Sequence, residues 1–194
     1  MYNQDNIHIP TQNDDEYKTI SLNQNSWCAA EFAKHGAILI KSFFANEKEF
    51  INIYSKCLLS GSLNRKEFGN NPYGENIDNI EILKIHNFNI FREQTIILNN
   101  NDSFMKTLDN DIMNEFYKKI YVKSNTMENI RGNIFILVSC NGVTYTLLPV
   151  LNDEYILLNS AQNSIKLMNH KDLCKNILVD NGTYLHITLL YGTL

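Results

Sequence analysis

Apolar residues recur at helical spacing in three segments of the chain. Residues 27–40 follow a polar stretch in which Asn25 or Ser26 can cap the free amides of a helix. A second pattern begins at Asn46, the expected cap, and is expected to stop at Gly61. The third segment carries one apolar stripe with a four-residue spacing, made of Phe104, Leu108, Ile112, Phe116 and Ile120. We therefore predict a helix in each of these three segments.

The last third of the chain changes to short runs rich in β-branched and aromatic residues. Runs at 134–138, 143–150 and 155–158 are separated by Asn141-Gly142 and Asn152-Asp153, which are hairpin turn signals. These runs predict an antiparallel meander, and helices followed by a sheet define an α+β fold. The remaining expectations are a loop at 62–76, short strands at 80–85 and 95–98, a short helix at 171–177 and a last strand at 184–191.

Length and composition favour one folded domain in a reducing compartment. The chain has 194 residues, of which 44% are hydrophobic, and this is enough for a core without disulfides or metals. Residues 1–20 are expected to form a polar arm, and residues 21–194 a single domain. Because the arm lacks a secretory signal and the four cysteines lie far apart, we expect an intracellular, cytoplasmic protein with no metal and no cofactor.

Charge and hydropathy narrow the class of partner. A net charge of −4 provides no basic field for a nucleic-acid backbone. No apolar run approaches the roughly 20 residues that cross a membrane. We therefore expect a protein partner, and neither nucleic acid nor a membrane.

Cys28 is the residue on which chemistry can be centred. It falls in the first turn of a predicted helix, where the helix dipole lowers the pKa of a thiol and favours the nucleophilic thiolate. Gln24 and Asn25 lie just before it and could donate amide hydrogen bonds to a developing oxyanion. The competing interpretation is a packed core cysteine, which its neighbours Trp27 and Ala29 favour.

Three segments occur in a particular order: residues 25–30 (Asn-Ser-Trp-Cys-Ala-Ala), residues 53–63, and a late hairpin over 141–161 that ends in Leu-Leu-Asn-Ser-Ala. Together they resemble the papain-like deubiquitinating peptidase domain of herpesvirus large tegument proteins. In that family a cysteine opens the first long helix, a D-x-V-L-x-x-G-type pattern follows, and the late hairpin ends in Phe-Asp-Ser-His. The resemblance implies a papain-like cysteine peptidase architecture in a viral or pathogen-derived protein, with Cys28 in the position of the nucleophile.

The late hairpin departs from the family at both catalytic positions. Asn159 stands where the family has a carboxylate, and Ala161 stands where it has the histidine. Alanine can neither take the thiol proton nor protonate a leaving amine. Another histidine, His186 in the last predicted strand, could serve if the sheet brought it near Asn159. A papain-like chain should also cluster Cys28 with Asn159 and Ala161 across one cleft.

Three functions remain open at this stage. The first is a pseudoenzyme, a degenerate papain-like domain that binds a protein, with ubiquitin or a ubiquitin-like protein as the partner that the resemblance implies. The second is an active cysteine peptidase or deubiquitinase that pairs Cys28 with a displaced His186. The third is a structural or assembly protein with no active site, in which Cys28 belongs to the core.

Overall fold

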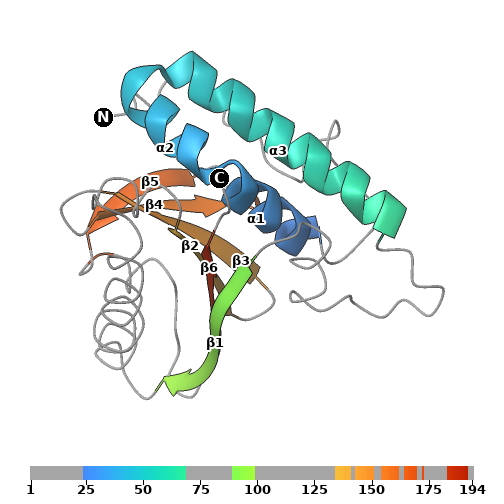
Figure 1. The fold of residues 1–194 in the computed structure, drawn as a ribbon, viewed down its shortest axis with the longest axis vertical. Coiled ribbons are helices and arrows are strands. Elements are labelled where there is room, and N and C mark those ends of the chain that lie inside the picture. Colours follow the sequence, from blue (N-terminus) through green and yellow to red (C-terminus); the bar gives the residue numbers. More distant parts are fainter. Residues whose placement is uncertain are drawn as a thin grey trace.

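The computed structural model describes residues 24–68, 89–98, 134–140, 143–150, 154–161, 164–169, 172 and 183–191. Its helices come first and its strands follow, so the α+β class is confirmed (Figure 1). The helices are α1 (Gln24–Lys34), α2 (Gly36–Ala45) and α3 (Glu47–Phe68). The strands are β1 (Asn89–Leu98), β2 (Ile134–Cys140), β3 (Val143–Pro149), β4 (Glu154–Asn159), β5 (Ser164–Asn169) and β6 (Thr183–Tyr191).

The six strands form one sheet in the order β1-β6-β2-β3-β4-β5, and every neighbouring pair is antiparallel. The predicted meander is confirmed, because its three strands β2, β3 and β4 are neighbours both in the chain and in the sheet, and β5 extends it by one strand. The last strand, β6, returns beside β2 instead of adding to the far edge. β1, whose second half is the run predicted at 95–98, then pairs with the outer side of β6.

α1 is the buried centre of the helical layer. It lies between α3 on one side and the sheet on the other (Figure 1). A helix with packing on both sides has few positions in contact with water, which explains the run of small and apolar residues in its middle. Seven consecutive side chains of α1 are buried: Trp27, Cys28, Ala29, Ala30, Glu31, Phe32 and Ala33.

Hydroxyl groups tie the helices to the strands across long stretches of chain. The Oγ1 of Thr146 on β3 donates to the carbonyl oxygen of Ala29 at 3.1 Å. On α3, the hydroxyl of Tyr54 donates to the carbonyl oxygen of Asn159 at 3.4 Å, and its ring stacks on Phe32 of α1 at 4.7 Å between centroids. Both helices are therefore held in register with the middle of the sheet.

The observed start of the first helix differs from the prediction. α1 begins at Gln24, so neither Asn25 nor Ser26 is its cap. The helical pattern through residue 40 is divided at His35, where α1 ends in a turn and α2 begins at Gly36. By contrast, Asn46 caps α3 as predicted, since its Oδ1 accepts a hydrogen bond from the amide of Glu49 at 3.1 Å.

Gly61 does not stop the second predicted helix. α3 continues to Phe68, so the loop prediction is wrong for residues 62–68. A Cβ at Gly61 would lie 2.8 Å from the Sγ of Cys28 and 2.9 Å from its Cα and its amide nitrogen. The glycine is needed for the close approach of α1 to α3, and not for a left-handed cap.

Other predicted elements fall outside the described residues: the arm at 1–20, the rest of the loop at 69–76, the strand at 80–85, the helix that carries Phe104 to Ile120, and most of the helix at 171–177. β5 was not predicted, because its short sequence between polar ends gives little strand signal. Among the described helices, none has the length and apolar character needed to cross a membrane.

Candidate functional site

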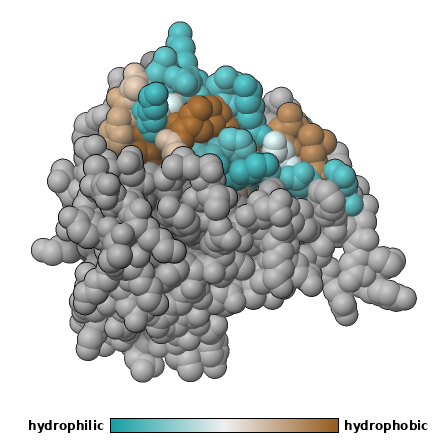
Figure 2. All heavy atoms as spheres, in the orientation of Figure 1, coloured by the Kyte–Doolittle hydropathy of each residue, from teal (hydrophilic) through white to brown (hydrophobic). Residues whose placement is uncertain are grey.

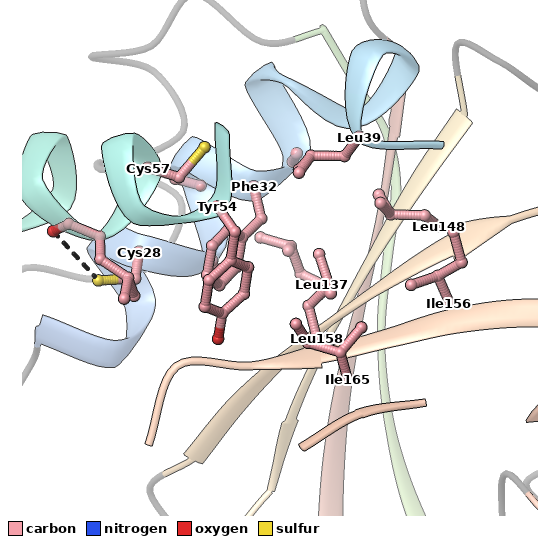
Figure 3. Close-up of a cluster of buried hydrophobic side chains, with 14 of the residues drawn as sticks. Cys28, Phe32, Leu39, Tyr54, Cys57, Leu137, Leu148, Ile156, Leu158 and Ile165 are labelled. Atoms are coloured by element: carbon pink, nitrogen blue, oxygen red, sulfur yellow. Dashed lines mark hydrogen bonds between the residues drawn. The ribbon is translucent and has the colours of Figure 1, made fainter. Parts of the chain in front are cut away.

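The side chain of Cys28 is completely buried between α1 and α3. Cys28 is the fifth residue of α1, and its thiol points to the carbonyl oxygen of Leu58 on α3 at 3.9 Å (Figure 3). The hydroxyl of Ser160, directly after β4, also hydrogen-bonds to this thiol. The sulfur is therefore enclosed by protein groups and has no exposed surface.

Burial controls the protonation of this thiol. The pKa of Cys28 is raised to about 12, mainly by loss of solvation and to a smaller extent by the nearby Glu31, while the hydrogen bond with Ser160 acts in the opposite direction. The position near a helix start does not produce the thiolate that the sequence suggested, because desolvation is the larger effect. At neutral pH Cys28 is a protonated thiol.

The end of β4 lies beside Cys28 through Ser160. Asn159 is buried at the last position of the strand, and its Oδ1 accepts a hydrogen bond from the backbone amide of Ala161 at 2.9 Å. Ser160 lies between the two predicted site residues in this turn, and its hydroxyl meets the sulfur of Cys28. The structure thus brings the cysteine segment and the late hairpin together, but the group on the sulfur is a hydroxyl.

His186 is placed elsewhere in the sheet. It lies on β6, where its cross-strand partners are Thr95 of β1 and Ser139 of β2. Two strands, β2 and β3, separate β6 from β4. Since neighbouring strands are about 4.8 Å apart, the backbones of His186 and Asn159 belong to strands roughly 14 Å apart. The two residues do not form the neighbouring pair that the sequence suggested.

A chain of hydroxyl groups runs from α1 across two strands. The Oγ of Ser26 lies 3.0 Å from the Oγ1 of Thr144 on β3, and this oxygen lies 3.0 Å from the Oγ of Ser139 on β2. Ser139 is in turn the cross-strand partner of His186. The sequence analysis did not single out Thr144, Ser139 or Ser160 as site residues, because a lone hydroxyl in a strand or turn has no pattern that distinguishes it.

A second buried polar group lies on the α3 side of α1. One carboxylate oxygen of Glu31 accepts a hydrogen bond from the Nδ2 of Asn64 at 2.7 Å, and the other lies 3.6 Å from the Nδ1 of His35. Desolvation raises the pKa of Glu31, and the nearby Lys34 and His35 partly counter it. The thiol of Cys57 points to the backbone oxygen of Glu31 at 3.7 Å, and burial raises the pKa of this thiol strongly.

Gln24 and Asn25, the candidate oxyanion donors, are the first two residues of α1, and the structure describes only their backbone. In the part of the chain that the structure describes, no three ligand-type side chains converge to hold a metal ion. No protein family matches the chain, and no curated protein matches it significantly.

Proposed function

We propose that this chain is a catalytically degenerate papain-like domain that acts as a protein-binding module, with ubiquitin or a ubiquitin-like protein as its partner. The observation that carries the proposal is the state of Cys28. Its thiol is fully buried and its pKa is raised to about 12, and the adjacent hairpin offers an alanine at the position of the catalytic base. A protonated thiol without a base cannot act as a nucleophile.

The arrangement of the elements also supports the papain-like part of the proposal. A cysteine near the start of a central helix meets the end of a strand in an antiparallel sheet, through Ser160. The second segment of the resemblance contributes Gly61, which allows α3 to approach the cysteine. All three segments that carry the resemblance therefore meet at one place in the fold.

A second candidate, an active thiol peptidase, is favoured by one observation. The hydroxyl chain through Thr144 links Ser26, two residues before Cys28, to the cross-strand partner of His186. Catalysis by this route would require the thiol to leave its buried position and the proton to cross the hydroxyl chain. The third candidate is a structural or assembly protein with no active site. Binding experiments with ubiquitin distinguish it from the protein-binding module.

The deciding experiment treats the full chain with a ubiquitin probe that carries a C-terminal vinyl sulfone, alongside a fluorogenic ubiquitin substrate. We expect no adduct and no hydrolysis, and the same result for Cys28→Ala. In parallel, ¹⁵N-labelled ubiquitin is titrated with wild type and with Cys28→Ala, and equal chemical-shift changes are expected for both. An adduct that requires Cys28 would establish the peptidase, and unchanged ubiquitin spectra would exclude ubiquitin as the partner.

A further inference from the structure

A buried carboxylate lies against the turn that joins α1 to α2. Figure 2 shows hydrophilic side chains on the surface of the helical layer, where a helix normally carries its carboxylates. Glu31 is instead buried, with only 2% of its side-chain surface accessible, whereas His35 in the turn is 41% exposed. Acidic side chains are almost never buried to this extent unless they are paired. The groups that contact Glu31 therefore decide whether its charged form is tolerated.

Glu31 connects the turn to α3. Its carboxylate accepts a hydrogen bond from the Nδ2 of Asn64 on α3 at 2.7 Å and lies 3.6 Å from the Nδ1 of His35. Its backbone oxygen accepts a hydrogen bond from the amide of His35 at 3.1 Å and lies 3.0 Å from the same Nδ1. Because a carbonyl oxygen only accepts, the Nδ1 carries a hydrogen in this arrangement, and the ring gains or loses its charge at Nε2. The ring therefore keeps its contact with Glu31 in both charge states.

The turn between α1 and α2 interrupts a pattern that favours one continuous helix. Apolar residues keep helical spacing over residues 27–40, but the structure divides them at His35. Helical hydrogen bonds are present on both sides of this point. The amide of His35 donates to the backbone oxygen of Glu31, and the amide of Leu39 donates to that of His35 at 2.9 Å. The change of direction is therefore local, and the contacts between Glu31 and His35 lie where it occurs.

The charge of this cluster is set by a few titratable groups. Desolvation raises the pKa of Glu31, while the positive charges of Lys34 and His35 act in the opposite direction. The thiols of Cys28 and Cys57 also lie near the carboxylate, and burial raises the pKa of each. Both thiols are therefore protonated at pH 8 and below, and Glu31 and His35 are the groups whose protons can change. When both have lost their titratable protons, a buried carboxylate remains beside an uncharged ring.

We infer that Glu31, Asn64 and His35 form a proton-dependent latch on the turn between α1 and α2. The latch holds while Glu31 or His35 carries its titratable proton, and it opens more readily when neither does. In the open state Glu31 reaches water, and the amides of His35 and Leu39 lose their hydrogen bonds. The latch is a local device of the helical layer. It goes beyond the proposed binding function and depends on neither Cys28 nor ubiquitin.

The test measures amide hydrogen exchange in the full chain by NMR at pH 4 and pH 8, with each rate corrected for the intrinsic rate at that pH. The protection factors of the His35 and Leu39 amides should be at least about threefold lower at pH 8, because opening releases a carboxyl whose pKa is raised in the closed state. At pH 8 these amides should also exchange faster than the amide of Tyr54 in the middle of α3.

Urea distinguishes a local opening from unfolding of the whole protein. Addition of about 1 M urea should accelerate exchange at Tyr54 and leave His35 and Leu39 nearly unchanged, because a local opening exposes little surface. Equal urea dependence of all three amides would mean that the whole protein unfolds, and it would overturn the latch.

Three variants assign the effect to its groups. Glu31→Gln still accepts the hydrogen bond from Asn64 but cannot ionise, so the protection of the turn should be the same at both pH values. Glu49→Gln removes an exposed carboxylate at the start of α3 and is the matched control, which should keep the wild-type pH dependence. His35→Gln removes the ring contacts and should lower the protection of Leu39 at both pH values.

Circular dichroism checks that each variant is folded. The inference is overturned if the pH dependence persists in Glu31→Gln or disappears in Glu49→Gln. Wild-type protection of Leu39 in His35→Gln at both pH values would also overturn it, because the ring would then have no part in the latch.

Discussion

Gly61 of α3 and Cys28 of α1 are in such close contact that the glycine has no room for a side chain. A Cβ there would lie 2.8 Å from the sulfur and 2.9 Å from two backbone atoms of Cys28. The sulfur could turn aside, but the backbone of a buried helix cannot move without disturbing its packing against the sheet. The spacing of the two helices is therefore set at this contact.

The first prediction follows directly. Gly61→Ala should destabilise the protein by about 1–3 kcal/mol, the range for an overpacked core, although alanine is otherwise the better helix former. Urea denaturation followed by circular dichroism measures the change. Ser60→Ala, at the preceding half-buried position, is the control and should stay within about 0.5 kcal/mol of wild type. A Gly61→Ala variant as stable as wild type would contradict the described contact.

The second prediction concerns the thiol of Cys28. Because burial raises its pKa to about 12, iodoacetamide at pH 7.5 should label Cys28 at least tenfold more slowly than it labels free cysteine. Peptide mapping by mass spectrometry assigns the label, and labelling in 6 M guanidinium shows that the residue can react once unfolded. Rapid labelling of Cys28 in the folded protein would argue for a reactive site.

The same shift gives a third prediction for stability at alkaline pH. In the unfolded chain a cysteine ionises at about pH 8.5, whereas in the folded protein Cys28 stays protonated to about pH 12. The unfolded state therefore loses protons first, and stability should fall as the pH rises above about 8.5. In urea denaturation at pH 7.5 and pH 10, Cys28→Ala should lose less stability over this interval than wild type does. Equal losses for the two proteins would contradict the assignment.

The fourth prediction uses Glu31, whose pKa is raised mainly by desolvation. Burial of its charged form is unfavourable, so its contribution to stability is fully present below the unfolded pKa, near 4.3, and is lost as the pH rises. Glu31→Gln keeps an acceptor for Asn64 and removes the charge. The stability of the variant relative to wild type should therefore be greater at pH 8 than at pH 4, as thermal unfolding at the two pH values measures. A pH-independent difference would show that Glu31 titrates normally.

The fifth prediction addresses the hydroxyl chain. Thr144→Val removes the group that contacts both Ser26 and Ser139, each at 3.0 Å, and should cost about 1–2 kcal/mol. Thr144→Ser keeps the hydroxyl and is the matched control. In a double-mutant cycle with Ser26→Ala, the two substitutions should couple by at least about 0.5 kcal/mol. Additive effects would mean that the two hydroxyls do not stabilise one another.

The sequence was sufficient for the elements whose signals are local. The amide cap at Asn46 and the strand patterns at 143–150 and 155–158 depend only on neighbouring residues, and all three are found in the structure. The role of Gly61 was misread because a glycine at a helix crossing and a glycine at a helix end look alike in one sequence. Only the partner helix, more than thirty residues away, distinguishes them.

The candidate site was predicted only in part, because some of its features depend on contacts between distant parts of the chain. Cys28 was identified from its place near a helix start and the segment at Asn159 from the resemblance, and the structure brings them together through Ser160. The position of His186 could not be obtained from the sequence, because strand order depends on where the last strand enters the sheet. Whether a cysteine near a helix start becomes a thiolate also depends on burial, and burial is a property of the whole fold.

The hydroxyl ties between α1 and β3 have a consequence for how the protein is made. Ser26 contacts Thr144 across 118 positions of the chain, and Ala29 contacts Thr146 across 117. A ribosome adds about 5–20 residues each second, so α1 is synthesised several seconds before the strand that covers it. During that interval its apolar surface has no partner from the sheet. Contacts between residues this far apart in the chain also predict slow folding. A chaperone would be needed most while only the N-terminal half of the chain has been made.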